Sequence, residues 1–228
     1  MGRFPQLLGA RGSKKWIQRL INERPEILND KIRERFLLDD SDAIEWLSPK
    51  KEDEYAEYRD YSFIKKLGIT LSHHSIEDFW PSGGPQWDAL GRLKSGGSVL
   101  IEAKSHISEM ISTIKATDED SLRKIRFSLN KTKEYLRAKA EPNWSIGFYQ
   151  YMNRLAFLYL LRELNIIPAY LIFVYFLNDE EMDGPKTVNE WKGAIKLLHS
   201  YLGLERNKLK KYVAEVFIDV KLLEKKEF

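Results

Sequence analysis

The chain contains no cysteine among its 228 residues. This absence excludes a disulfide scaffold, a thiol nucleophile and a zinc site with cysteine ligands. The longest apolar run, at residues 166–177, has only 12 residues and includes a proline, so it is too short to span a bilayer. The N-terminal residues lack the apolar core of a signal peptide. We therefore expect a soluble, cytoplasmic protein that has no membrane partner.

An excess of charge of one sign is also missing. The 37 Lys and Arg residues nearly balance the 34 Asp and Glu residues, which leaves a net charge of +3. Net charge therefore does not argue for a nucleic-acid partner, and only the distribution of charge can do so. Hydrophobic residues make up 43% of the chain, which excludes a disordered protein and is enough for a substantial core.

Helical and extended patterns alternate along the chain. Apolar spacing predicts helices at residues 14–37 (divided at Pro25), 42–48, 52–66 (ended by Gly68), 121–138, 143–164 and 187–202 (capped by Thr187). Strands are expected at residues 69–71, 87–93, 98–105, 170–177 and 212–220, with a glycine-bearing turn at 94–97. This order is typical of an α/β fold. We assign residues 1–43 to an N-terminal helical extension and residues 44–228 to the main domain, within one compact unit.

The strand expected at residues 98–105 carries two charged side chains on one face. Glu102 and Lys104 are two residues apart, so they point the same way along a strand. The opposite face is apolar and consists of Val99, Ile101 and Ala103. A hairpin that turns near residues 96–97 brings Asp88 beside Glu102. The sequence therefore predicts that two carboxylates and one ammonium group converge.

This combination of groups is suited to the cleavage of phosphodiesters. Asp88, Glu102 and the backbone carbonyl of Ala103 are hard oxygen ligands of the kind that Mg²⁺ or Mn²⁺ prefers. A cation bound there would activate water and neutralise charge on the phosphate. Lys104 would position that water or stabilise the pentacovalent phosphorus. An isolated Glu-x-Lys on a strand is also common as a solvated cross-strand pair, and this alternative stays open.

Asp88 followed across a hairpin by Glu102-Ala103-Lys104 resembles the PD-(D/E)XK nuclease superfamily. The proline of the motif departs from the pattern, because Pro85 stands three residues before Asp88 instead of next to it. The segments that look like an uncharacterised branch of the superfamily are Trp46-Leu-Ser-Pro, Tyr55-Ala-Glu-Tyr, Trp87-Asp-Ala, Glu102-Ala-Lys and Tyr149-Gln-Tyr-Met-Asn-Arg-Leu. The resemblance implies an α/β, restriction-endonuclease-like αβββαβ core, with a mixed central sheet flanked by helices and with extra N-terminal helices. In it, residues 52–66 form the first helix and residues 69–71 the first strand.

The resemblance also implies further residues of the site. Members of the superfamily often carry an acidic residue on the first core helix, and Glu57 fits this role, with Glu45 as the second choice. A solvated acidic face explains Glu57 equally well. Gln150 matches loosely the glutamine on the helix after the motif strand, because Arg154 stands where some branches have a tyrosine. The expected catalytic residues are therefore Asp88, Glu102, Lys104, Glu57 and Gln150.

Basic residues gather in the helix expected at residues 121–138. We expect Arg154, Arg123, Lys124 and Lys131 to contact a phosphate backbone. An ordinary solvated helix shows the same basic face, so the charge pattern is open to both interpretations.

The sequence thus predicts a divalent-metal-dependent nuclease that hydrolyses nucleic acid, with Mg²⁺ or Mn²⁺ as cofactor and DNA as the expected substrate. One alternative is a non-catalytic nucleic-acid-binding or assembly protein that keeps the nuclease fold. Another is an interaction protein in which the motif is a coincidence, and a third is a metal hydrolase of other phosphate esters. A homodimer is compatible with the sequence.

Overall fold

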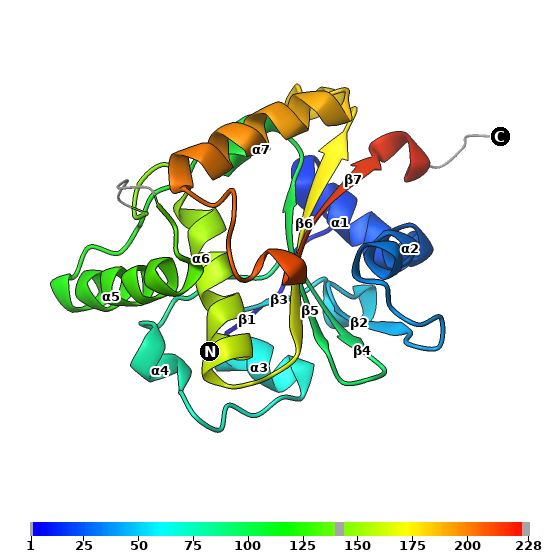
Figure 1. Cartoon of the computed structure of the whole chain (residues 1–228). Coiled ribbons are helices and arrows are strands. Elements are labelled where there is room, and N and C mark those ends of the chain that lie inside the picture. The colour runs from blue at the N-terminus through cyan, green and yellow to red at the C-terminus, as the bar shows by residue number, and fades with distance from the viewer. Residues whose placement is uncertain (1, 140–143, 225–228) are drawn as a thin grey trace.

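The computed structural model describes residues 2–139 and 144–224, and its centre is a five-stranded mixed sheet (Figure 1). The strands, in their order across the sheet, are β2 (Ile44–Ser48), β4 (Ala89–Leu93), β5 (Ser98–Lys104), β6 (Ala169–Leu177) and β7 (Val213–Asp219). β4 is antiparallel to both β2 and β5, whereas β5, β6 and β7 run parallel. A separate antiparallel pair joins β1 (Arg3–Phe4) to β3 (Glu57–Tyr58).

Helices cover both faces of this sheet (Figure 1). One face carries α1 (Gly12–Glu23) and α2 (Pro25–Phe36). The other carries α3 (Tyr61–Leu67), α4 (Ile76–Phe79), α5 (Glu119–Leu136), α6 (Tyr149–Tyr159) with a π-helical turn at Leu160–Leu164, and α7 (Val188–Leu202). Short 3₁₀ turns lie at Lys51–Asp53, Ile107–Met110, Glu180–Met182, Lys210–Tyr212 and Val220–Leu222. The expected α/β class, with a mixed sheet between helices, is confirmed.

The sheet separates two apolar cores, and the alternation of side chains along β5 decides which residues enter each core. Val99, Ile101 and Ala103 pack with α1 and α2. Leu100 packs on the other side, in the core that contains α6. Glu102 and Lys104 share the face of Leu100, because side chains two residues apart on a strand point the same way. β5 therefore directs both charged groups toward α6, and they share one face of the strand as the sequence predicts.

Several predicted helix ends are confirmed. α2 begins with Pro25, which needs no hydrogen-bond partner for its backbone nitrogen at that position. Gly68 ends α3 with φ of 69°, a left-handed conformation that favours glycine. The hydroxyl of Thr187 accepts a hydrogen bond from the backbone N–H of Glu190 at 3.3 Å and caps α7.

Within residues 42–71, three predicted elements are wrong. Residues 44–48 form an edge strand instead of a helix, because they pair with β4. The helix expected at residues 52–66 is interrupted, since Glu54 and Tyr55 have positive φ values of 53° and 50° that no α-helix accommodates. Residues 69–71 form no strand, because the N–H of Ile69 closes the end of α3 onto the carbonyl of Ile64. Residue 143, the expected start of the next helix, lies outside the described residues, and residues 144–148 are not helical, because α6 begins only at Tyr149.

No helix within residues 2–139 and 144–224 combines the length and the apolar character that crossing a membrane requires.

The packing of α7 predicts a difference between two adjacent leucines. Leu198 is 1% exposed and Leu197 is 67% exposed. Replacing Leu198 by Ala leaves a cavity, so we expect the free energy of unfolding to fall by about 2–5 kcal/mol. The control, Leu197→Ala, should change it by less than about 0.5 kcal/mol. Urea denaturation checks both values, and equal effects of the two changes would contradict this packing.

Candidate active site

Three of the predicted site residues lie where the β4–β5 hairpin opens. Asp88 directly precedes β4, and Glu102 and Lys104 lie at the end of β5. The backbone N–H of Ala103 donates a hydrogen bond to Oδ2 of Asp88 at 2.7 Å. The hairpin therefore brings Asp88 against β5, between the two charged residues of that strand.

The two strands separate at this point. Their last paired residues are Ala89 and Ile101, and a continued register would place Trp87 opposite Ala103. Instead, the N–H of Trp87 donates to the carbonyl of Tyr58 at 3.0 Å, so the chain turns away from β5 before it enters β4. The carboxylate of Asp88 replaces the backbone of Trp87 as the acceptor for the N–H of Ala103.

Glu102 is 1% exposed, and both of its carboxylate oxygens accept hydrogen bonds from cations. Nζ of Lys104 donates to Oε1, while Nε and Nη2 of Arg154 lie 2.6 and 2.5 Å from Oε2. Arg154 is also buried, and it donates to Oδ1 of Asn153 at 2.9 Å and to the carbonyl of Gln86 at 2.7 Å. Because an unpaired buried carboxylate is costly, these two cations explain how Glu102 is accommodated in the core.

Gln150 holds the other side of the lysine. Its Oε1 accepts a hydrogen bond from Nζ of Lys104 at 2.8 Å. Gln150 and Arg154 are four residues apart on α6, so one face of the helix presents both side chains to β5. The backbone N–H of Gln150 donates to Oγ of Ser112 at 2.8 Å, which fixes the start of α6 against residues 111–118.

Glu57 also reaches the site. It is 7% exposed, and Nε2 of Gln86 donates to its Oε2. The bridge between Tyr58 and Trp87 holds β3 beside the chain that enters β4. Glu57 therefore lines the same cleft as Asp88.

The helical position predicted for this acidic residue is wrong. Glu57 lies on β3, and Glu45, the second choice, lies on the edge strand β2. Glu45 pairs with Arg92 at 2.8 Å and is not among the residues that line the cleft. Of the two candidates, only Glu57 is brought together with Asp88.

The carboxylates influence one another's ionisation. Burial raises the pKa of Asp88 well above its usual value, and the negative charges of Glu102 and Glu57 raise it further. Burial likewise raises the pKa of Glu57. Burial acts on Glu102 in the same direction, but Arg154 and Lys104 outweigh it and hold the pKa of Glu102 below its usual value. Nearby cations also act on Asp88 and Glu57, but within residues 2–139 and 144–224 neither forms an ion pair like those of Glu102 with Lys104 and Arg154.

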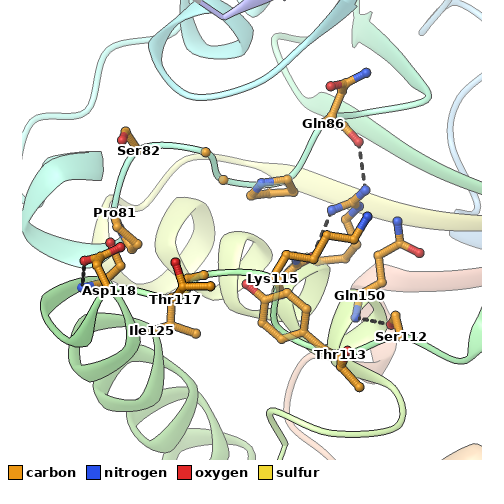
Figure 2. A pocket seen from close by; sticks show the side chains of 18 of the residues that line it. Pro81, Ser82, Gln86, Ser112, Thr113, Lys115, Thr117, Asp118, Ile125 and Gln150 are labelled. Atoms are coloured by element: carbon orange, nitrogen blue, oxygen red, sulfur yellow. Dashed lines mark hydrogen bonds between the residues drawn. The ribbon is translucent and has the colours of Figure 1, made fainter.

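A cleft of about 950 Å³ is lined by Glu57, Asp88, Gln150 and Arg154, whereas Glu102 and Lys104 are not among its lining residues. Figure 2 shows its walls, which come from residues 81–86, residues 111–118 and the first turn of α6. Lys115 extends into the cleft from the second of these segments (Figure 2). Within residues 2–139 and 144–224, Lys115 forms no ion pair. It is therefore a cation available to a ligand.

The structure separates the four residues expected to contact nucleic acid. Arg154 lines the cleft, but it is only 3% exposed and its guanidinium is directed at Glu102. Arg123, Lys124 and Lys131 lie on α5, outside the residues that line the cleft. Each of the three already binds an acidic side chain or a carbonyl group of the chain.

The oxygen atoms at the opening of the hairpin fit a hard divalent cation. The carbonyl of a strand residue points to the same edge as its N–H, so the carbonyl of Ala103 faces the side on which Asp88 lies. Oε1 of Glu102 becomes a third oxygen if Lys104 moves away from it. No cluster of three or more His, Asp or Glu side chains with metal-binding geometry occurs in the described part of the chain. An ion here would therefore depend on this carbonyl and on water, which Mg²⁺ readily keeps.

Two residues of the site escape sequence analysis. Lys115 lies in a segment without helical or strand periodicity, so no pattern placed it near the hairpin. Gln86, two residues before Asp88, binds both Glu57 and Arg154. Its proximity to Asp88 along the chain was the only available signal.

Comparisons of the chain with protein-family models, with curated proteins and with solved structures found no match. The function must therefore be inferred from the chemistry of the site itself. Its main features are an open strand pair, a buried glutamate paired with two cations, and two carboxylates with raised pKa values.

The raised pKa of Asp88 predicts that this residue destabilises the metal-free protein at neutral pH. Stability is full below the unfolded pKa of about 4 and is lost as the pH rises through the higher folded pKa, by at most about 1.4 kcal/mol per pH unit. Asn at this position keeps an acceptor for the N–H of Ala103 but carries no charge. We therefore expect Asp88→Asn to raise the free energy of unfolding at pH 8, and the gain to shrink toward pH 4.

The matched control is Asp40→Asn, because the side chain of Asp40 is 98% exposed. This change should alter the free energy of unfolding by less than about 0.5 kcal/mol at either pH. Urea denaturation with a chelator present measures both variants. A loss of stability in Asp88→Asn at pH 8 would show that the carboxylate is already compensated within the protein.

Proposed function

We propose that the chain is a divalent-metal-dependent nuclease of the PD-(D/E)XK type, with Mg²⁺ or Mn²⁺ as cofactor and with nucleic acid, expected to be DNA, as substrate. The observation that carries this proposal is the convergence of Asp88, Glu102 and Lys104 where β4 and β5 separate. Glu57 and Gln150 extend the same group of side chains.

The order of the elements is compatible with a restriction-endonuclease-like core. If β3, α3, α4 and α5 are treated as insertions, then α2, β2, β4, β5, α6 and β6 follow the expected order of helix, three strands, helix and strand. Here α2 and β2 take the places predicted for residues 52–66 and 69–71. In this proposal the helices of residues 1–43 thus include the first helix of the core.

The side chains divide the work of hydrolysis among themselves. Asp88, the carbonyl of Ala103 and Oε1 of Glu102 would hold the ion, whose chemical contribution is to offset negative charge that grows on the phosphate. Lys104 places its ammonium group beside the reacting phosphate, where it stabilises the same charge directly. Gln150 orients this ammonium group when Oε1 of Glu102 turns to the ion. Glu57, whose pKa burial raises, is suited to exchange a proton at a higher pH than an ordinary glutamate.

Lys115 is the residue that we assign to substrate binding. It has no ion-pair partner within residues 2–139 and 144–224, and it extends into the cleft that Asp88 lines. The substrate phosphates on either side of the cleaved bond are its natural partners, because each carries a negative charge. The basic face of α5 would contact more distant phosphates.

One observation favours the alternative, a protein that binds nucleic acid without cleaving it. Both oxygens of Glu102 are already satisfied, by Lys104 and by Arg154, so this network is complete without an ion. A non-catalytic protein would keep that network for stability and would bind nucleic acid equally well when metal is removed.

Cleavage assays with purified variants test the proposed activity. In Mg²⁺ or Mn²⁺, native protein should cleave at least one of single-stranded DNA, double-stranded DNA and RNA. Asp88→Asn and Lys104→Met should each lose at least about 100-fold in rate, because each removes a group that stabilises the transition state. The control, Lys65→Met, removes an exposed charge from α3 and should cleave normally.

Circular dichroism should show all three variants folded. Undiminished cleavage by Asp88→Asn or Lys104→Met would refute the catalytic assignment. Metal-independent binding by native protein, with no cleavage of any of the three substrates, would establish the non-catalytic alternative.

The role of Lys115 predicts a change in KM instead of kcat. Lys115→Ala should raise KM about tenfold, which corresponds to the loss of one charge-assisted phosphate contact, and should leave kcat nearly unchanged. Lys115→Arg should keep most of the native affinity, because it keeps the charge. Initial rates measured over a range of substrate concentrations separate the effect on KM from the effect on kcat. An unchanged KM for Lys115→Ala would remove Lys115 from the substrate site.

A further inference from the structure

A second pocket lies on the side of α6 that faces away from the catalytic cleft. Gln150 and Arg154 line the cleft, whereas Tyr151 and Leu155 line this pocket. Its volume is about 420 Å³, and its other walls come from α7, β7 and residues 204–210. The helix therefore separates two sites, of which only the first belongs to the proposed hydrolysis.

Positive charge dominates the second pocket. Arg35, Lys192 and Lys210 line it together with a single acidic residue, Glu215. Across the described ranges 2–139 and 144–224, none of these three cations forms an ion pair with an acidic side chain. All three act on the same carboxyl group, since their charges oppose the effect by which burial raises the pKa of Glu215. Three converging cations and one carboxylate leave an excess of positive charge, which suits a multiply charged anion.

Backbone carbonyls hold Arg35 in place. Nη2 of Arg35 donates to the carbonyls of Lys210 and Val213 at 3.2 and 3.0 Å, which fixes the guanidinium at the rim. Planar guanidinium groups bind phosphate oxygens in pairs, and ammonium groups bind them as point charges. The three cations at the rim favour a doubly charged phosphate over a singly charged carboxylate.

The inner part of the pocket is apolar and aromatic. Tyr151 is 7% exposed, its hydroxyl lies 2.9 Å from Nε2 of His199, and its ring stacks on Phe173 with centroids 4.3 Å apart. Side chains that complete the apolar lining are Leu155, Leu204, Val213 and Phe217. A pocket of this size, with an apolar interior and polar groups at its rim, accommodates one small organic molecule.

We propose that this pocket binds a phosphate-bearing ligand of the size of a mononucleotide. Lys192, Lys210 and Arg35 hold the phosphate, and the ring system of the ligand enters the apolar part beside Tyr151. A polynucleotide is the less suitable occupant, because the pocket has less than half the volume of the cleft.

Isothermal titration calorimetry on the full chain tests this assignment without divalent metal, so the result does not depend on nuclease activity. The probes are inorganic phosphate, adenosine monophosphate and a short single-stranded oligonucleotide. We expect the mononucleotide to bind most tightly to this pocket. Lys192→Ala and Lys210→Ala should each weaken its binding about tenfold, because each removes one cation from the phosphate.

Two controls locate the effect. Lys65→Ala removes a charge from α3, which packs near β4 at the opposite part of the sheet from β7, and should leave the affinity unchanged. Asp88→Asn alters the cleft and should also leave it unchanged.

Three results would overturn the proposal. The first is equal mononucleotide affinity in native protein, Lys192→Ala and Lys210→Ala. The second is the absence of mononucleotide binding at millimolar concentration. The third is binding of inorganic phosphate or of the oligonucleotide at least as tight as that of the mononucleotide, since either outcome removes the assigned ligand class.

Discussion

The candidate active site depends on one interruption of backbone pairing between β4 and β5. Buried N–H and C=O groups need hydrogen-bond partners, so when one strand leaves a ladder, another group must take over its hydrogen bonds. Trp87 leaves for the carbonyl of Tyr58, and the carboxylate of Asp88 takes its place opposite Ala103. A continuous ladder would fill this position with backbone and would leave no space for a ligand. The same interruption thus orients Asp88 and leaves the carbonyl of Ala103 without the N–H of Trp87 as its partner.

Beside this opening, charge is distributed unevenly. Glu102 is buried and is neutralised by Lys104 and Arg154, whereas neither Asp88 nor Glu57 forms an ion pair within the described part of the chain. A protein selected for stability alone has little reason to place two further carboxylates near a buried glutamate. Local destabilisation of this kind is common at functional sites, where it is retained because binding of the ligand offsets it. The second pocket shows the opposite imbalance, with excess positive charge on the other side of α6.

The part of the site that lies on regular elements could be predicted from the sequence. The two-residue alternation of β5 and the glycine turn were enough to place Glu102, Lys104 and Asp88 near one another, because both signals are local. Residues 44–48 and 57–58 were predicted incorrectly as helical, since their conformation depends on pairing with distant segments: β2 with β4, and β3 with β1. Glu57 was named for a helix that does not exist, yet β3 brings it to the cleft. Tertiary packing determines the environments of Arg154 and Lys115, and no local periodic pattern in a single sequence reveals them.

The most direct test of the central claim is a crystal of native protein soaked in Mn²⁺, with anomalous diffraction used to locate the ion. The account predicts an anomalous peak within bonding distance of the carboxylate of Asp88 and the carbonyl of Ala103, accompanied by movement of the Lys104 ammonium group away from Glu102. Ordered density for Asp88 and Ala103 with no peak between them, at Mn²⁺ concentrations that support cleavage by other metal-dependent nucleases, would contradict it.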